Sequence, residues 1–237
     1  MSEHEFGRYT GKLILDPSGG SQQAKTTLEF GFLDRNGRHW PVPSGTSVGA
    51  ASIPRALRSL LGDWRQGMYR EAIVVHDYYC AARSTDWPEV YRIFYQAMLV
   101  SGVPMRRAKL VYAGVYFAGP RWQNRPVNAP QTGQLVRPRH TSPAVLLYAL
   151  CRDPVALAMS EAITCNGRSA FEWITAEQTD TGGSQTTLEL GPLSAMLEEN
   201  DPSLPELEAA IDYAVSLIPG SESAARDLSV GRTTLLD

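Results

Sequence analysis

The sequence has little cysteine, no long apolar run and no excess of positive charge, and each shortage excludes a class of protein. Its 237 residues contain three cysteines, Cys80, Cys151 and Cys165, without Cys-x-x-Cys spacing. An odd count with no such framework is typical of reduced thiols and argues against a disulfide-stapled secreted protein. Because no apolar run reaches about 18 residues, we expect no membrane span.

Charge and composition narrow the class further. The net charge is −3 at pH 7, and the sequence pI is about 5.8. Nucleic-acid binders usually carry a basic surface, so we predict no nucleic-acid partner. The first five residues are polar and acidic, unlike a secretory signal. A hydrophobic content of 43% is ordinary for a globular protein. The sequence therefore predicts a globular cytoplasmic protein.

The first fifty residues are predicted to form a small antiparallel sheet. Strand-like segments lie at 9–15, 26–33 and 39–43. Between the second and third, Asn36-Gly37 is a strong hairpin signal. Prolines in the third segment suggest an edge strand.

Helices follow this sheet in the predicted order. Helical patterns lie at 56–61, 68–83, 86–102 and 103–118. Ser52 is a candidate cap for the first, and Asp86 for the third. The fold class is therefore α+β, with a small N-terminal antiparallel sheet, a helical hairpin and further helices, and residues 1–122 form one predicted domain.

The chain after residue 122 is predicted to form a proline-containing linker at 123–140 and a mostly helical C-terminal extension at 141–237. A helical segment is predicted at 142–162, a possible strand at 186–190 and an extended tail at 219–237. An amphipathic helix at 204–218 carries an apolar stripe, and Glu208 lies mostly off this stripe. Such a stripe must be covered, either within the chain or by a protein partner or a second copy of the chain.

The candidate site centres on His76 and Asp77, which stand at the middle of the second helix. At helical spacing the imidazole and the carboxylate point about 100° apart. His76 is either a general base with a pKa near neutrality or a core histidine. Asp77 is either an orienting or metal-binding carboxylate, or the partner of an arginine such as Arg55, Arg83 or Arg92.

Neighbouring residues leave similar alternatives open. Cys80 follows His76 by one helical turn and is either a nucleophile or a small buried thiol. Ser52 lacks a Gly-x-Ser-x-Gly elbow, so helix capping competes with a chemical role. Ser52, Arg55, Tyr79 and Arg83 are the substrate-binding candidates. No histidine spacing predicts a metal site, and no cofactor is expected.

Six ordered motifs resemble an uncharacterised family of phage, prophage and bacterial proteins. These motifs are Asp34-x-x-Gly37-x-x-Trp40-x-Val42-Pro43, Gly49-Ala50-Ala51-Ser52-Ile53-Pro54-Arg55, Val75-His76-Asp77-Tyr78-Tyr79, Phe94-Tyr95-x-Ala97-Met98, Gly102-Val103 and Tyr116-Phe117-x-Gly119-Pro120-Arg121-Trp122. Two positions depart from the family pattern: Gly49 replaces a usual aspartate, and Tyr91 replaces a usual aspartate or histidine.

A looser likeness is to the helix pair of the phospholipases A2. It implies that His76 is a general base, that Asp77 binds calcium and that position 91 orients the imidazole. One carboxylate is too few for tight calcium binding, so we expect no tight divalent site. The sequence thus favours a hydrolase-like domain with His76, Asp77 and Tyr91 at its centre, acting on a small molecule, a lipid or another ester. The alternative is a catalytically degenerate, phage-related interaction or structural protein.

Overall fold

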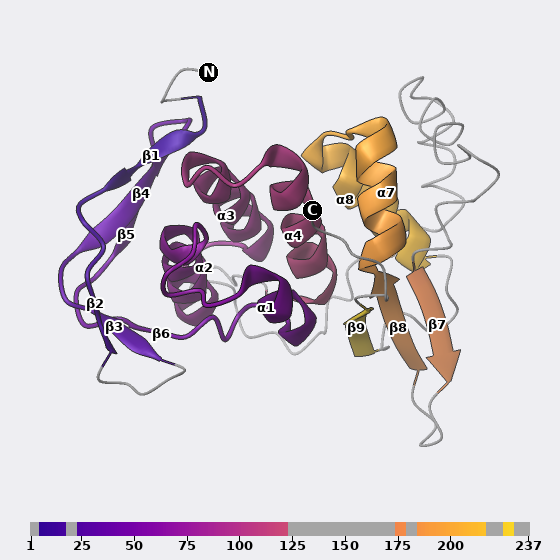
Figure 1. The fold of residues 1–237 in the computed structure, drawn as a ribbon, viewed down its shortest axis with the longest axis horizontal. Coiled ribbons are helices and arrows are strands. Elements are labelled where there is room, and N and C mark those ends of the chain that lie inside the picture. Colours follow the sequence, from indigo (N-terminus) through magenta and orange to yellow (C-terminus); the bar gives the residue numbers. More distant parts are fainter. Residues whose placement is uncertain (1–4, 18–22, 123–173, 179–183, 217–224, 230–237) are drawn as a thin grey trace, which may run out of the picture.

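The chain folds as an N-terminal group of strands, a central group of helices and a C-terminal group of strands and helices (Figure 1). The structure is a computed structural model that describes residues 5–17, 23–122, 174–178, 184–216 and 225–229. The predicted linker at 123–140 and the predicted helical segment at 142–162 lie outside these residues. The α+β fold class is confirmed.

Six short strands make two N-terminal sheets. They are β1 (Gly7–Thr10), β2 (Leu15–Asp16), β3 (Ala24–Thr26), β4 (Phe30–Asp34), β5 (His39–Val42) and β6 (Ser47–Val48). The sheets have the orders β1-β4-β5 and β2-β3-β6, and every pairing in them is antiparallel. The predicted edge position of the 39–43 strand is confirmed, because β5 pairs only with β4 among the described strands.

The β4–β5 hairpin is fixed by one carboxylate. Asp34 accepts hydrogen bonds from the backbone N–H groups of Asn36 (2.8 Å) and Arg38 (2.9 Å). Its other oxygen accepts from Nε1 of Trp40 at 3.1 Å. Since Gly37 has a φ of 82°, the turn uses the conformational freedom of glycine at this position. The hairpin thus brings a buried tryptophan against the helices.

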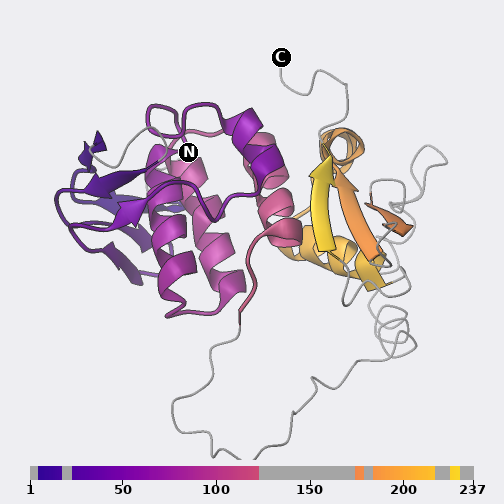
Figure 2. The same ribbon diagram turned by 90° about the horizontal axis from the view of Figure 1, so that it is seen from below.

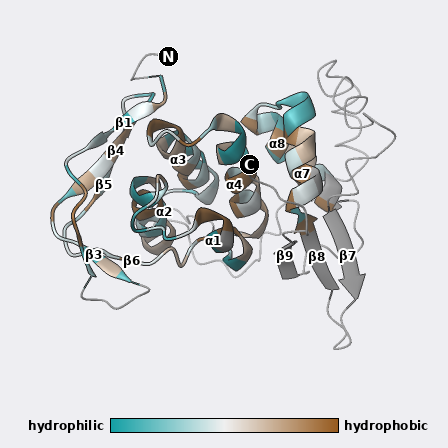
Figure 3. Cartoon of the chain, in the orientation of Figure 1, coloured by the Kyte–Doolittle hydropathy of each residue, from teal (hydrophilic) through white to brown (hydrophobic). Residues whose placement is uncertain are grey.

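Four helices form the centre, and the sequence located all of them. They are α1 (Arg55–Leu61), α2 (Arg70–Ala82), α3 (Trp87–Val100) and α4 (Met105–Ala118). A short connection between α2 and α3 makes the predicted helical hairpin. Figure 3 shows hydrophobic residues along these helices, in the middle of the molecule.

The close approach of α1 to α4 depends on a glycine. A Cβ atom placed on Gly114 would lie 2.8 Å from Cδ1 of Leu57. Leu57 is fully buried, so its side chain would have to shift within the packed core to admit this atom. The two helices therefore meet at a contact without room for a methyl group.

The C-terminal part contains a sheet as well as helices. Its elements are β7 (Ile174–Gln178), β8 (Ser184–Glu189), α7 (Leu190–Asn200), α8 (Leu204–Ser216) and β9 (Ala225–Ser229). β8 pairs antiparallel with β7 and parallel with β9. The strand predicted at 186–190 is thus present, whereas β9 lies in a segment that we expected to be an extended tail. Figure 2 shows β8 and β9 side by side.

The stripe on α8 is covered within the chain. Leu207, Ile211 and Val215 are buried in the same hydrophobic cluster as the central helices. Glu208, which we placed mostly off this stripe, is buried as well. Its carboxylate pairs with Arg92 of α3 and accepts a hydrogen bond from the hydroxyl of Tyr112 of α4. This pairing gives Arg92 a partner other than Asp77.

Candidate functional site

The site forms where the loop between β6 and α1 crosses helix α2. The carboxylate of Asp77 accepts hydrogen bonds from the backbone N–H groups of Gly49 (2.9 Å) and Ser52 (3.1 Å). The hydroxyl of Ser52 also donates to this carboxylate. Asp77 is therefore held by the loop, and none of the ion pairs among the described residues joins it to Arg55, Arg83 or Arg92.

The loop takes an unusual backbone conformation to reach Asp77. Ala50 has a φ of 53°, in the left-handed region that residues with a side chain rarely adopt. Such a conformation costs roughly 1–3 kcal/mol and persists where surrounding contacts enforce it. Here the enforcing contacts are the two N–H groups on either side of Ala50 that bind Asp77.

The predicted cap role of Ser52 is wrong, because α1 begins after Pro54 with no side-chain cap.

His76 is fully buried, and both of its ring nitrogens face side chains. Nδ1 lies 2.8 Å from Oγ of Ser52. Nε2 lies 3.5 Å from Sγ of Cys80, one turn further along α2. The imidazole packs between the rings of Phe94 (centroids 4.5 Å apart) and Tyr91 (5.3 Å). These contacts build a continuous row of polar groups, Cys80–His76–Ser52–Asp77.

Burial sets the protonation states in this row. Removal from water lowers the pKa of His76 to about 4, and the charge of Asp77 opposes this shift without cancelling it. The imidazole is therefore neutral at pH 7. Burial raises the pKa of the Cys80 thiol, and the charge of Asp77 raises it further. Cys80 is thus a protonated thiol rather than an activated thiolate.

A cavity of about 380 Å³ opens beside this row and gives it access to small molecules. Ser52, Asp77 and Cys80 contribute to its wall, together with Arg58, Gln23, Ser47, Val48, Gly49, Ala51, Ala81 and Pro120. We call this space the Ser52 cavity. His76 does not line it, so the imidazole can act on a bound molecule only through Ser52 or Cys80.

Tyr91 contacts His76 through its ring face, not through its hydroxyl. The hydroxyl donates to the carbonyl oxygen of Pro120. The arrangement implied by the phospholipase likeness is therefore wrong in two respects. Position 91 does not orient the imidazole by a hydrogen bond, and the nitrogens of His76 face Ser52 and Cys80 rather than a water site.

Three of the four substrate-binding candidates lie away from the Ser52 cavity. Tyr79 donates its hydroxyl to the carbonyl of Pro41 at 3.1 Å and packs against Trp40. Arg55 and Arg83 are exposed, and neither contributes to the cavity wall. Sequence spacing could not separate these exposed arginines from one that faces a cavity.

The arginine that does line the cavity was missed by sequence reasoning. Arg58 donates to the carbonyls of Ile53 (2.8 Å) and Ala51 (3.1 Å), so it supports the loop from the α1 side. Its position one helical turn after Pro54 was the available signal, because a residue there faces back toward the loop.

The described part of the chain holds no cluster of three or more histidine, cysteine, aspartate or glutamate side chains suited to a metal ion. In the same residues no helix is long and apolar enough to cross a membrane. The oxygens of Asp77 already accept hydrogen bonds from Gly49 and Ser52.

Part of this chain is similar in sequence to proteins whose function is not established. Residues 25–115 match the model of a family described as "Protein of unknown function (DUF1353)". Two proteins of Sinorhizobium fredii, both described as uncharacterized (y4iH and y4jT), are 38% and 36% identical over 124 and 128 residues. Each match covers 52% of this chain, and 52% and 38% of the two relatives.

No solved structure matches the chain. The family match includes the loop and both residues of the His76-Asp77 pair. In residues 25–115, which hold the candidate site, the chain is thus similar to a family of unknown function.

Proposed function

We propose that the Ser52 cavity is the active site of a hydrolase that cleaves a small carboxylic ester, of a lipid or of another compound. The observation that carries the proposal is the position of the Ser52 hydroxyl. It lies at the cavity wall, within hydrogen-bond distance of both His76 and Asp77. A hydroxyl becomes a nucleophile when a neighbouring base takes its proton.

In the proposed reaction Ser52 Oγ attacks the ester carbonyl and its proton passes to Nδ1 of His76. The imidazolium then gives its Nε2 proton to Cys80, whose thiol proton passes to the leaving alcohol, and an acyl-serine remains. A water molecule attacks the acyl group by the same route, which releases the acid and restores Ser52. This sequence requires the Ser52 hydroxyl to turn its proton from Asp77 to Nδ1 before attack. It also requires Nδ1 to be free of a proton at the start, with the hydrogen on Nε2 facing the sulfur of Cys80.

Asp77 has two parts in this proposal. Its charge favours the imidazolium that forms during attack, in line with its effect on the pKa of His76. Its hydrogen bonds to Gly49 and Ser52 hold the loop, and with it the attacking oxygen, in place. His76 is thus the base, Ser52 the nucleophile and Asp77 the positioning group.

A second candidate function is a non-catalytic interaction or structural protein that descends from such an enzyme. The observation in its favour is that the polar row is satisfied internally and its base is fully buried. A neutral imidazole with a pKa near 4 is also a weak base. In this view the same contacts serve to lock the loop onto α2.

The test is labelling with a fluorophosphonate probe, which reacts with activated serines, followed by peptide mass spectrometry. We expect modification of Ser52 in the native chain and its loss in Ser52→Ala. Hydrolysis of p-nitrophenyl esters with short and medium acyl chains should fall by about 100-fold or more in the same variant, as expected when a nucleophile is removed.

Ser101→Ala is the matched control, because Ser101 bonds the hydroxyl of Tyr9 away from the cavity. It should keep both labelling and hydrolysis. Absence of labelling at Ser52 in a folded native chain, together with ester hydrolysis unchanged in Ser52→Ala, would leave the non-catalytic candidate standing.

A further inference from the structure

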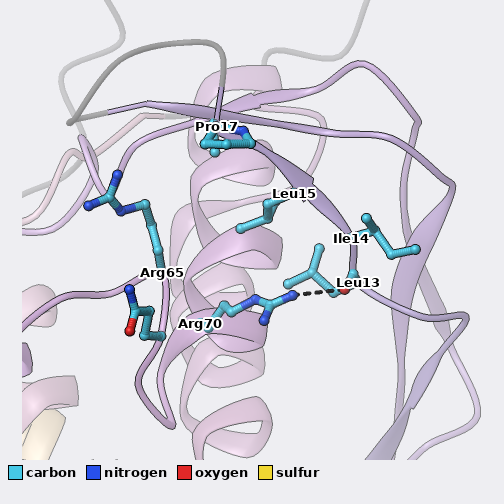
Figure 4. A pocket seen from close by; sticks show the side chains of 8 residues that line it. Leu13, Ile14, Leu15, Pro17, Arg65 and Arg70 are labelled. Atoms are coloured by element: carbon cyan, nitrogen blue, oxygen red, sulfur yellow. Dashed lines mark hydrogen bonds between the residues drawn. The ribbon is translucent and has the colours of Figure 1, made fainter.

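We propose that a second cavity, around Arg70, binds a small amphiphilic anion, which is an aliphatic body with a carboxylate or phosphate head. This cavity, the Arg70 pocket, has a volume of about 400 Å³ and is lined by Leu13, Ile14, Leu15, Pro17, Ala24, Arg65, Gln66 and Arg70 (Figure 4). Among the described residues it shares no lining residue with the Ser52 cavity, so the proposal does not depend on ester hydrolysis.

Arg70 carries a charge without a counter-ion in the described part of the chain. Its Nη2 donates to the carbonyl oxygen of Leu13 at 2.8 Å, and Figure 4 shows the guanidinium directed toward this carbonyl. Its Nε is one of two buried side-chain polar atoms without a hydrogen-bond partner among the described residues. None of the ion pairs in those residues involves Arg70. A half-buried guanidinium held in this way is prepared to take an anion.

The described wall of the pocket carries no acidic side chain. None of its eight described lining residues is acidic, and two of them are arginines. The second, Arg65, pairs with Asp63 at 3.0 Å, and both side chains are partly exposed. Exposed ion pairs contribute little, so Arg65 can turn toward an incoming anion at small cost. The electrostatics of the pocket therefore select for negative charge.

The remainder of the wall selects for an apolar body. Leu13, Leu15, Pro17 and Ala24 present aliphatic surface, and Ile14 beside them is 41% exposed. A volume near 400 Å³ lies at the lower end of the range for small-molecule sites. An ordinary inorganic anion would leave this aliphatic surface uncovered. A medium-length chain that ends in an oxyanion matches both parts of the wall.

The experiment is isothermal titration calorimetry on the full chain with four probes: octanoate, octyl phosphate, octanol and acetate. We expect saturable one-to-one binding of octanoate or octyl phosphate, and the tighter of the two identifies the head group. Octanol lacks the charge and acetate lacks the chain, so both should bind at least ~10-fold more weakly.

Two variants test the role of the charge. Arg70→Gln should weaken binding of the charged probe at least ~10-fold, as expected for loss of a charged hydrogen-bond partner. Gln66→Glu places a carboxylate in the pocket at an exposed position that does not disturb the core, and it should weaken binding in the same direction. Lys25→Gln is the control, because it removes one positive charge from the strand that carries Ala24 without touching the pocket.

The proposal is overturned if neither charged probe shows saturable binding at millimolar concentration. It is equally overturned if octanol binds as tightly as octanoate, or if both Arg70→Gln and Gln66→Glu bind the charged probe as the native chain does. Ester hydrolysis through Ser52 should be unchanged in Gln66→Glu, which separates failure of this site from failure of the proposed active site.

Discussion

Two buried carboxylates in this molecule are stabilised in different ways. Asp77 on α2 is held by backbone N–H groups and a serine hydroxyl, next to a neutral imidazole and a cavity. Glu208 on α8 is held by the guanidinium of Arg92 and the hydroxyl of Tyr112.

The difference shows what each carboxylate can do. The Glu208 group joins α8 to α3 and α4 through an ion pair and a hydroxyl. The Asp77 group is held by N–H and O–H dipoles alone and lies beside His76 and a cavity, where it can act on a developing positive charge. The Glu208 contacts hold helices together, whereas the Asp77 contacts are arranged as a candidate functional site would be.

The largest expected effect comes from removing the Asp77 carboxylate. Asp77→Ala leaves the N–H groups of Gly49 and Ser52 and the Ser52 hydroxyl without their acceptor. An unsatisfied buried group costs about 1–3 kcal/mol, and water in the Ser52 cavity compensates part of this cost at these part-buried groups, so we expect a loss of about 3 kcal/mol in the free energy of unfolding. Urea unfolding measures this value. If Asp77→Ala lost less unfolding free energy than Glu208→Gln, the Glu208 contacts would stabilise the fold more than the Asp77 contacts do.

The second effect is a dependence of stability on acidic pH that arises from His76, the neighbour of Asp77. His76 has a folded pKa of about 4 and an ordinary value of 6.5. The unfolded chain therefore binds a proton between these values that the folded chain does not, and stability is lost as pH falls from 6.5 toward 4. The full shift corresponds to about 3 kcal/mol.

Urea unfolding at several pH values checks this dependence. Other groups titrate in the same window, so the informative quantity is the difference between the native chain and His76→Gln. The curve of stability against pH should be flatter in the variant. Parallel curves would show that His76 is not buried in its neutral form.

On the other side of the comparison, Glu208→Gln should cost about 1–2 kcal/mol, because it removes a charged hydrogen-bond partner from Arg92. The side chain of Arg92 is 47% exposed, so water compensates part of the loss. Thermal unfolding of this variant and of Tyr112→Phe would separate the ion pair from the hydroxyl contact. Equal losses in the two variants would mean that the ion pair adds nothing.

The smallest effect on stability is expected at an exposed ion pair that joins α4 to the C-terminal helix α7. Arg106 of α4 and Glu198 of α7 lie 3.1 Å apart, and both side chains are 56% exposed. Arg106→Gln should change stability by no more than about 0.5 kcal/mol. A larger loss would indicate that exposed pairs, and not only the Glu208 cluster, fasten the C-terminal part.

The sequence predicted those elements whose signals are local. Asn36-Gly37 located the β4–β5 hairpin, and the Asp86-Trp87-Pro88 segment located the start of α3. The parallel strand β9 was missed because it pairs with β8 only after two intervening helices, and no local pattern encodes such a pairing.

The candidate site was predicted in part for a similar reason. His76 and Asp77 stood out because packing does not require a His-Asp pair in the middle of a helix. The role of Ser52 was misjudged, because its backbone N–H and hydroxyl turn toward α2 through the left-handed conformation of Ala50. Periodicity also placed Glu208 off the buried face, since it cannot foresee that an arginine from α3 reaches across to meet it.

The contact between Gly114 and Leu57 has a consequence for how sequences related to this one can vary. Because a methyl group at position 114 would lie within 2.8 Å of the leucine side chain, the two positions cannot enlarge independently. Relatives with alanine at 114 should carry a smaller residue at 57, so the pair should covary. An alignment in which alanine at 114 accompanies leucine at 57 as often as glycine does would show that α1 and α4 move apart freely during divergence.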